Sequence, residues 1–441
     1  MSGSSTAVEQ ANAPEVSWPE RIGIPALVTA TTISNIGNGI TNLAIPWFVL
    51  VTTGSPARTG IAGALVVLAN VLSSFLGGAV VDRLGHKRAS IFSDLLSGIT
   101  VAIIPTLYFA DVLEFWMLLA LIFAGAVFDA PGSVARNALI PRLARQARMP
   151  LERANSAMQF ADQGSRSLIG PLAAGLLIGF MSAASVLYID AATFAISVIV
   201  IGLLVRPLAR SAANGRAADA VEVPADESFI DSIRAGFRFA LKDDFLRLVM
   251  PISLLFNFVI SPLVAVVLPV LARDEFDSAT ALGFMIAAFG LGSALGTLAF
   301  GWKGHTLSRS WTFLAGVTMF AVSFWIIPLA SSVWIGMLAT GLLGLAVGPT
   351  NVLGMTLMQS RVPEEMLGRV LGFVFAIGAA LAPLGVFLAG ILIEATSLQT
   401  VMIASAVLTT IGTLRTYMLR DIVRQFDAEI ESGGELGKSE A

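Results

Sequence analysis

Gly78-Ala79-Val80-Val81-Asp82-Arg83-Leu84-Gly85-His86-Lys87-Arg88 places one acidic and three basic side chains between two long apolar runs, at residues 60–81 and 89–110. A helix spans a bilayer with about 17–25 predominantly apolar residues. The two runs are therefore predicted to be membrane-spanning helices. The charged stretch between them is predicted to be a short turn at one face of the membrane.

Similar apolar runs follow one another along the rest of the chain. Of its 441 residues, 56% are hydrophobic and only 13% are charged, whereas about 25% of the residues of a soluble domain are charged. The sequence predicts twelve spanning helices, at residues 22–52, 60–81, 89–110, 114–135, 157–180, 183–205, 246–272, 280–301, 311–330, 332–355, 368–393 and 397–419. We expect an all-α integral membrane protein whose surface faces a lipid bilayer.

One long polar connection divides these helices into two groups of six, which we expect to be two six-helix bundles. The expected parts are an N-terminal tail at 1–21, a bundle at 22–205, a linker at 206–245, a bundle at 246–420 and a tail at 421–441. Within the linker, apolar residues recur at helical spacing from Phe229 to Leu241. This spacing predicts an amphipathic helix on the membrane surface.

The positive charges predict the orientation of the chain. Arg58 and Arg273 fall on one side of the membrane and Arg166 lies within a span, so 24 of the 27 Lys and Arg residues fall on the other side. Positive charge accumulates on the cytoplasmic side of membrane proteins. The N-terminus also lacks the basic and apolar regions of a signal peptide. We expect a multi-pass protein of the inner cell membrane with both termini and the linker in the cytoplasm.

The tryptophans agree with this topology, because most of them fall near predicted helix ends, where aromatic side chains line the membrane interface. The expected positions are the outer ends for Trp47, Trp116 and Trp334, and the inner ends for Trp18, Trp302 and Trp311.

The two halves also carry a weak internal repeat. Gly85-His86 matches Gly304-His305 at an offset of 219 residues, and Pro131 matches Pro349 at an offset of 218. Near-constant offsets indicate duplication of a six-helix unit. In transporters built from such repeats, the substrate site lies between the halves near the middle of the membrane.

The opening stretch fits G-x-x-x-D-R-x-G-x-K-R, the signature of the loop that follows the second helix in the major facilitator superfamily. With Asn137-Ala138-Leu139-Ile140-Pro141, Gly170-Pro171 and Leu367-Gly368-Arg369-Val370, the chain resembles the macrolide-efflux and enterobactin-exporter branch over residues 20–420. This resemblance implies a monomeric secondary transporter that exports hydrophobic or amphipathic drugs, antibiotics or siderophores by alternating access. It also implies protons as the coupling ion.

The resemblance also implies that the signature loop is a gate, which locks the two halves together on the cytoplasmic side in the outward-open state. A carboxylate at the end of one helix can stabilise the positive N-terminal end of a neighbouring helix. The expected gating residues are Gly78, Asp82, Arg83, Gly85, Lys87 and Arg88. The alternative is that the basic residues serve only to orient the chain.

Charges inside the spans form a second group of candidates, because each costs roughly 2.5–3.5 kcal/mol near the bilayer centre. Asp162 and Arg166 are four residues apart and can pair along one helix face, and Asp129 can approach the same arginine. Together with Asp94, these are the expected proton-coupling charges. The alternative is a static charge network that closes the cytoplasmic end. A packing role is expected for Asp190.

Neutral amides form a third group. Asn35, Asn38 and Asn42 lie three and four residues apart, on one face of the first helix. Amides facing lipid would leave hydrogen bonds unmade, so this face is expected to line the substrate cavity, with Asn257 and Asn351 as counterparts in the second half. Interhelical hydrogen bonding is the alternative.

Drug export is not the only function that the sequence allows. Lysophospholipid or other lipid transport stays open as a second transporter function, and a membrane sensor or enzyme as a different class. The sequence contains no paired nucleophile and base and no Walker A motif, which argues against an enzyme. Neither a cofactor nor a metal is expected, because the chain has no cysteine and only two histidines. The net charge of −3 gives no sign of a nucleic-acid partner.

Overall fold

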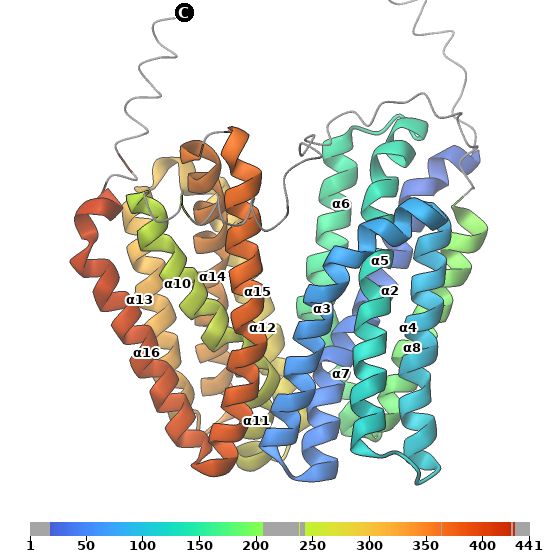
Figure 1. Cartoon of the computed structure of the whole chain (residues 1–441), viewed down its shortest axis with the longest axis horizontal. Helices are drawn as coiled ribbons and strands as arrows, with labels where there is room; N and C mark the ends of the chain where they lie inside the picture. Colours follow the sequence, from blue (N-terminus) through green and yellow to red (C-terminus); the bar gives the residue numbers. More distant parts are fainter. Residues whose placement is uncertain (1–17, 206–237, 239–242, 363, 425–426, 428–441) are drawn as a thin grey trace, which may run out of the picture.

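The computed structural model of this chain describes residues 18–205, 238, 243–362, 364–424 and 427. These residues form two helical bundles that lie side by side, each built from six spans (Figure 1). The helix expected between Phe229 and Leu241 lies outside the described residues, apart from position 238. The same holds for most of the 206–245 linker and of both tails.

The first bundle is continuous from Trp18 to Leu204. Its helices are α2 (Trp18–Thr53), α3 (Pro56–Leu84), α4 (His86–Phe109), α5 (Phe115–Gln146), α6 (Leu151–Gly164), η1 (Ser165–Ile169), α7 (Gly170–Phe180) and α8 (Ala183–Leu204). The segment η1 is a π-helical turn, so α6, η1 and α7 form one span with a widened turn in its middle.

The second bundle begins at Asp244. Its helices are α10 (Asp244–Pro262), η2 (Leu263–Val267), α11 (Leu268–Phe276), α12 (Ala279–Lys303), η3 (Gly304–Thr306), α13 (Arg309–Ile326), η4 (Ile327–Leu329), α14 (Val333–Arg361), α15 (Glu364–Ala395) and α16 (Leu398–Met418). A second π-helical turn, η2, joins α10 to α11 in one span.

Short capping turns explain how spans can follow one another so closely. Several helices begin just after a Ser or Asp residue. Its side chain accepts a hydrogen bond from the backbone N–H three residues further on, which satisfies one of the free donors at the start of the helix. These residues are Ser55, Ser182, Asp243, Ser278, Ser308 and Ser397. At Gly85, α3 gives way directly to α4, and φ there is +78°, a conformation that glycine adopts without strain.

The prediction of twelve spans is confirmed for the part of the chain that the structure describes. Eleven helices are long and apolar enough to cross a membrane. The twelfth is the continuous α6–η1–α7 segment, whose first half is polar. The predicted 114–135 span was too short, because α5 continues to Gln146. Apolarity ends where a helix leaves the lipid, whereas backbone hydrogen bonding continues beyond that point.

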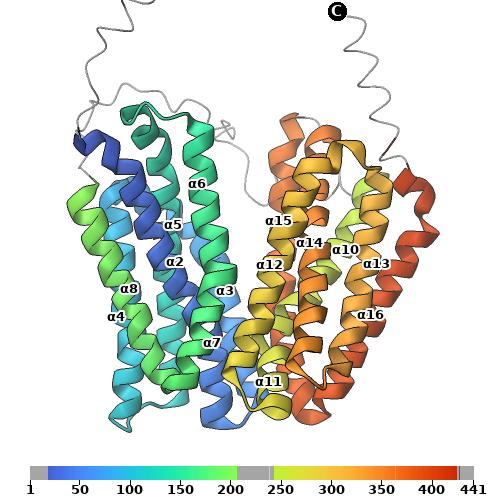
Figure 2. The same cartoon turned by 180° about the vertical axis from the view of Figure 1, so that it is seen from behind.

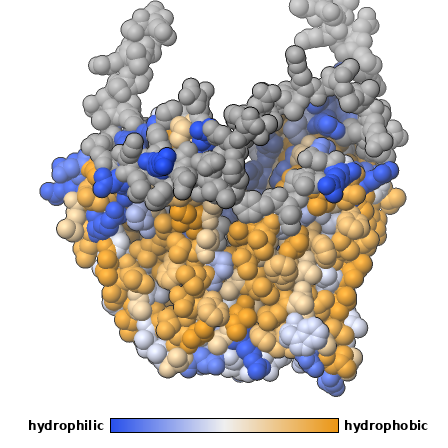
Figure 3. Space-filling model, viewed as in Figure 1, coloured by the Kyte–Doolittle hydropathy of each residue, from blue (hydrophilic) through white to orange (hydrophobic). Residues whose placement is uncertain are grey.

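The bundles present a broad apolar band with polar residues at both ends, as a bilayer requires (Figure 3). Trp116, Trp302, Trp311 and Trp334 are exposed near helix ends, as expected of interfacial aromatic residues. Trp47 was wrongly assigned to this group. It is only 7% exposed and belongs to the main hydrophobic core.

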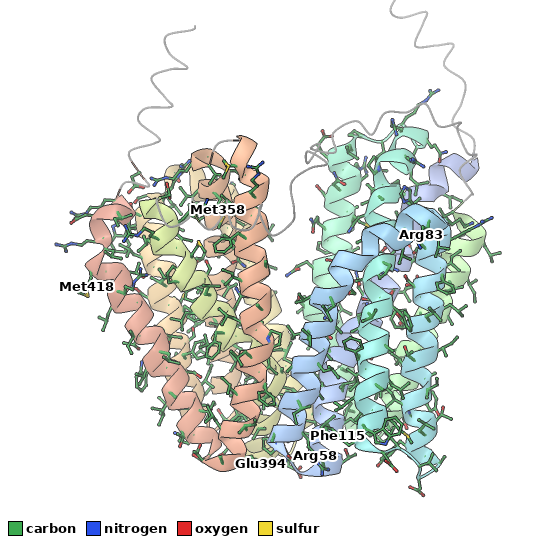
Figure 4. All side chains as sticks on the ribbon, in the orientation of Figure 1. Arg58, Arg83, Phe115, Met358, Glu394 and Met418 are labelled. Atoms are coloured by element: carbon green, nitrogen blue, oxygen red, sulfur yellow. The ribbon has the colours of Figure 1, made fainter. Side chains whose placement is uncertain are left out.

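The two bundles meet at one face of the molecule, which we name the closed face. It is formed by the turns that include Gly54 and Asp277. There, the opening turns of α3 pack on the end of α15, and α7 packs on the start of α12. Glu394 of α15 accepts hydrogen bonds from Ser55 Oγ and from the Ala57 N–H, 3.0 Å away, at the start of α3. In Figure 4, Glu394 and Arg58 lie at this face.

At the other face, which we name the terminal face, α2 begins and the chain leaves α16. The bundles diverge toward this face in both views (Figures 1 and 2). Glycines on the terminal-face halves of α14 and α15 have open space around them: an added Cβ at Gly354, Gly368 or Gly372 would meet nothing within 4 Å. The described residues are therefore closed at one face and separated at the other.

Candidate functional site

Asn35 joins two charged residues of the α6–η1–α7 span. Its Nδ2 donates to Asp162 Oδ1 at 2.7 Å, and its Oδ1 accepts from an Arg166 guanidinium nitrogen at 2.9 Å. Since arginine can only donate, the Asn35 oxygen must face Arg166, and the amide nitrogen is then left for the carboxylate. The sequence suggested a direct Asp162–Arg166 pair. The structure instead places the buried Asn35 between them.

Asn38, one turn further along α2, donates to Asp129. Its Nδ2 lies 3.3 Å from both carboxylate oxygens. Asp129 also interacts electrostatically with Asp94 and Arg136. Two of the α2 amides therefore make interhelical hydrogen bonds to two of the three candidate carboxylates, Asp162 and Asp129.

Asp94 forms a buried ion pair that sequence reasoning missed. Arg136 of α5 donates to Asp94 Oδ1 at 2.7 Å, and Ser197 of α8 donates to Oδ2 at 2.7 Å. The side chains of Arg136 and Asp94 are 2% and 0% exposed. Arg136 was overlooked because it lies one residue beyond the predicted span. Its spacing of seven from Asp129 places it on the same helix face and could have revealed it.

Asp190 of α8 is completely buried and accepts hydrogen bonds from two hydroxyls, one on α2 and one on the next turn of α8. Thr41 of α2 donates to Oδ2, and Thr193 donates to Oδ1 at 3.2 Å. Asp94, Asp129, Asp162 and Asp190 are four carboxylates of the first bundle that are buried or line a cavity. The arginines Arg136 and Arg166 are the basic residues that face them.

A central cavity of about 410 Å³ lies beside these residues. Its walls come from α2, α3, α4, α5, η1 and α8 of the first bundle, and from α10 and η2 of the second. Most of the lining is apolar, including Val67, Ile104 and Phe194. The polar or charged lining residues are Asn38, Thr41, Asn42, Asn70, Ser97, Asp129, Arg166, Asp190 and Ser261.

A second cavity, of about 420 Å³, lies nearer the terminal face between α2, α5 and α6. We name it the polar cavity, because among the described residues that line it only Ile140 and Met158 are apolar. The others are Thr31, Asn35, Ser133, Arg136, Asn137, Asn155, Gln159 and Asp162.

The expected amides of the second bundle occupy different positions. Asn257 and Asn351 are exposed and line neither cavity. Asn257 donates to the Ser253 carbonyl oxygen one turn earlier, at 2.9 Å. In the first bundle, Asn35 lines the polar cavity, whereas Asn38 and Asn42 line the central cavity.

The signature loop lies at the end of α3 and the start of α4. Lys87 Nζ donates to the Gly202 carbonyl oxygen of α8 at 2.8 Å, while Arg83 and Arg88 are exposed. Figure 4 shows Arg83 at the terminal-face end of its helix. The side chain of Asp82 and the surroundings of Gly78 lie outside what the structure describes.

Two six-helix bundles around a central cavity define the class of protein: this is a multi-pass transporter of the major facilitator superfamily. The chain belongs to the transmembrane secretion effector family, whose model matches residues 21–436. Members of this class are transporters rather than enzymes.

Curated relatives cover most of the chain. It is 29% identical to the multidrug efflux pump Tap of Mycolicibacterium fortuitum over 381 residues, which is 86% of this chain and 91% of Tap. It is 28% identical to the enterobactin exporter EntS of Escherichia coli O1:K1 over 356 residues, which is 79% of each chain.

Solved structures share the fold. The nucleoside transporter NupG superposes with a TM-score of 0.73 at 15% identity, covering 90% of this chain and 98% of that one. A bacterial homologue of the lysosomal transporter Spinster gives a TM-score of 0.67 at 14% identity, covering 94% and 98%.

Proposed function

We propose that this chain exports hydrophobic or amphipathic small molecules by alternating access. The central cavity carries the proposal: it is bounded by both bundles, its wall is mainly apolar, and a few polar groups project into it. Ligand sites commonly combine an apolar wall with a small number of polar groups. Two relatives, the multidrug efflux pump Tap and the enterobactin exporter EntS, support the same direction of transport.

The terminal face is assigned to the cytoplasm in this proposal. Arg58 and Arg273 lie near the closed face, whereas nearly all other Lys and Arg residues belong to the terminal side. The positive-inside rule then places both termini and the 206–245 linker in the cytoplasm. With this orientation, the described conformation is open to the cytoplasm. The bundles at 22–205 and 246–420 would rock about the contacts of the closed face.

Proton antiport is the proposed energy source. The four carboxylates Asp94, Asp129, Asp162 and Asp190 outnumber Arg136 and Arg166, which leaves a formal surplus of negative charge in this interior group when all six are ionised. Such a surplus inside a membrane favours uptake of a proton. We assign coupling to Asp129 and Asp162, because protonating either weakens its acceptance of an α2 amide hydrogen bond. Asp94 is assigned to a supporting role, since Arg136 and Ser197 already satisfy it.

The signature loop is proposed as the gate of the other state. When the terminal face closes, Asp82 at the end of α3 would approach the start of α15, at Glu364, where a helix N-terminus attracts negative charge. Asn257 and Asn351 are proposed to face the substrate path from the second bundle.

An accumulation assay tests the proposed function. Cells that lack their major pumps would express the chain, and uptake of ethidium, tetraphenylphosphonium and erythromycin would be measured with and without a protonophore. We expect lower accumulation of at least one compound, restored by the protonophore. Unchanged accumulation of all three would refute drug export.

Coupling is tested in the same cells with carboxylate-to-amide variants. The double variant Asp129→Asn with Asp162→Asn should abolish protonophore-sensitive export. The matched control is Asp277→Asn, an exposed carboxylate at the closed face whose φ of +44° asparagine also tolerates. Export that persists in the double variant would exclude both residues as the coupling acids.

A further inference from the structure

We propose that protons and substrate use separate routes: protons leave the charged network through the polar cavity, and the substrate occupies the central cavity. This inference rests on the proposed proton-coupled export and specifies where the proton passes. No described residue lines both the polar cavity and the central cavity, and the inference depends on this separation.

The hydrogen-bonded network forms the wall between the two cavities. Asn35 and Asp162 line the polar cavity. Asn38, Asp129 and Arg166 line the central cavity. The Asn35 amide contacts both Asp162 and Arg166, so a single side chain connects a group on one side of the wall with a group on the other.

The lining of the polar cavity suits water rather than an apolar substrate. Thr31 Oγ and Arg136 Nε are buried, belong to lining residues, and have no hydrogen-bond partner among the described residues. Buried polar groups are normally satisfied, often by ordered water. At about 30 Å³ per water molecule, the volume accommodates a chain of hydrogen-bonded water. The central cavity offers mainly hydrocarbon instead.

Release of the proton is assigned to Asp162, because it is the carboxylate of this network that lines the polar cavity. Arg136 of α5 interacts electrostatically with both Asp162 and Asp129, and Arg166 of η1 is joined to Asp162 through Asn35. Arg136 also forms an ion pair with Asp94, and Asp129 also interacts electrostatically with Asp190. The neighbouring helix α2 contributes neutral Asn35, and α12, packed on η1, has no charged side chain before Lys303.

In the cytoplasm-open state, the Asp162 O–H bond breaks and its proton passes to a water molecule of the polar cavity, which becomes hydronium and diffuses to the cytoplasm. The carboxylate left behind accepts the Asn35 N–H, which is the 2.7 Å hydrogen bond observed. The Asn35 carbonyl oxygen stays with Arg166, so release of the proton also fixes η1 against α2.

The absence of cysteine in the chain allows a direct test. Gln159→Cys places a thiol in the polar cavity, and the matched variant Ala126→Cys places one in the central cavity. Inside-out membrane vesicles would be treated with a cationic, membrane-impermeant methanethiosulfonate. Labelling would be measured with and without whichever compound of the accumulation panel is exported.

We expect the compound to slow labelling of Ala126→Cys at least fivefold and that of Gln159→Cys less than twofold. Modified Gln159→Cys should lose at least 90% of export driven by a pH gradient, while its Kd for the compound stays within twofold. Equal protection of both thiols, or proton-driven export that survives the modification, would overturn the separate routes.

A second pair of variants needs no reagent. Ser133→Leu narrows the polar cavity and Ala126→Leu narrows the central cavity. The first should reduce pH-driven export without changing the Kd, and the second should weaken binding of the compound. The reverse pattern would contradict the inference. If the unmodified cysteine variants and the parent chain export nothing, the proposed function fails, and this failure is distinguishable from an incorrect proton route.

Discussion

Replacing Gly283 of α12 with alanine should force the closed face open. A Cβ there would lie 2.6 Å from the Pro171 carbonyl oxygen and 2.9 Å from Gly175 Cα, both in the opposite bundle. Ordinary contacts of a Cβ begin at about 3.4 Å. Because the obstructing atoms belong to the backbone of α7, a rotamer change cannot remove the clash, and the two helices must separate.

The size of the effect follows from the cost of overpacking, which is typically about 1–3 kcal/mol. That cost applies only while α7 and α12 are in contact. The equilibrium between the two faces should therefore shift toward opening of the closed face by about 5- to 150-fold. The control is Gly301→Ala on the same helix, where an added Cβ meets nothing within 4 Å.

Thiol labelling from outside the cell measures this shift. Val264→Cys places a single thiol in the central cavity, in otherwise cysteine-free chains. With an impermeant maleimide added to whole cells, the labelling rate should rise at least fivefold in Gly283→Ala and stay unchanged in Gly301→Ala. Equal rates in the two variants would refute the view that close backbone packing keeps this face shut.

Three further outcomes are expected. Arg136→Leu leaves Asp94 buried without its partner, so the free energy of unfolding in detergent should fall by about 3–5 kcal/mol, whereas replacing both with apolar residues should restore most of it. Glu394→Gln should also speed labelling of the Val264→Cys thiol from outside the cell, as Gly283→Ala does. The increase should be smaller, because this carboxylate is exposed to solvent. Burial raises the pKa of Asp427, yet hydrogen bonds at the start of α13 hold it below the ordinary value. The docking of this residue should therefore be complete above about pH 4 and lost as pH falls through the lowered pKa, which hydrogen exchange of residues 419–424 would show.

The sequence was sufficient to predict the helices because the length and apolarity of each run are local properties. The predicted helix ends were wrong where a helix extends beyond its apolar segment. Arg136 was missed for this reason, because α5 continues past the predicted end at residue 135. Trp47 shows a related limit: its position near a helix end fits the interface equally well, and only packing shows that it is in the core.

The contacts within the site could not be predicted in the same way. Spacing within one helix suggested that Asp162 and Arg166 pair directly, but the π-helical turn begins between them, and Asn35 inserts from a helix 127 residues away along the chain. The division between a polar and an apolar cavity is likewise a property of several helices together. A sequence pattern identifies which residues are polar, but not which of them share a cavity.

The π-helical turn also explains how charges confined to one bundle can act on both. Arg166 of η1 binds Asn35, while the next residue, Ser167, presents its carbonyl oxygen to the second bundle, where an added Cβ on Gly290 of α12 would lie 2.2 Å away. Widened turns of this kind recur at functional sites. When the hydrogen bond between Arg166 and Asn35 changes, η1 moves relative to α2. Because Ser167 of η1 also packs on α12, this movement displaces the contact between the two bundles. The second bundle needs no charged residue in the membrane for this coupling, only a close backbone contact.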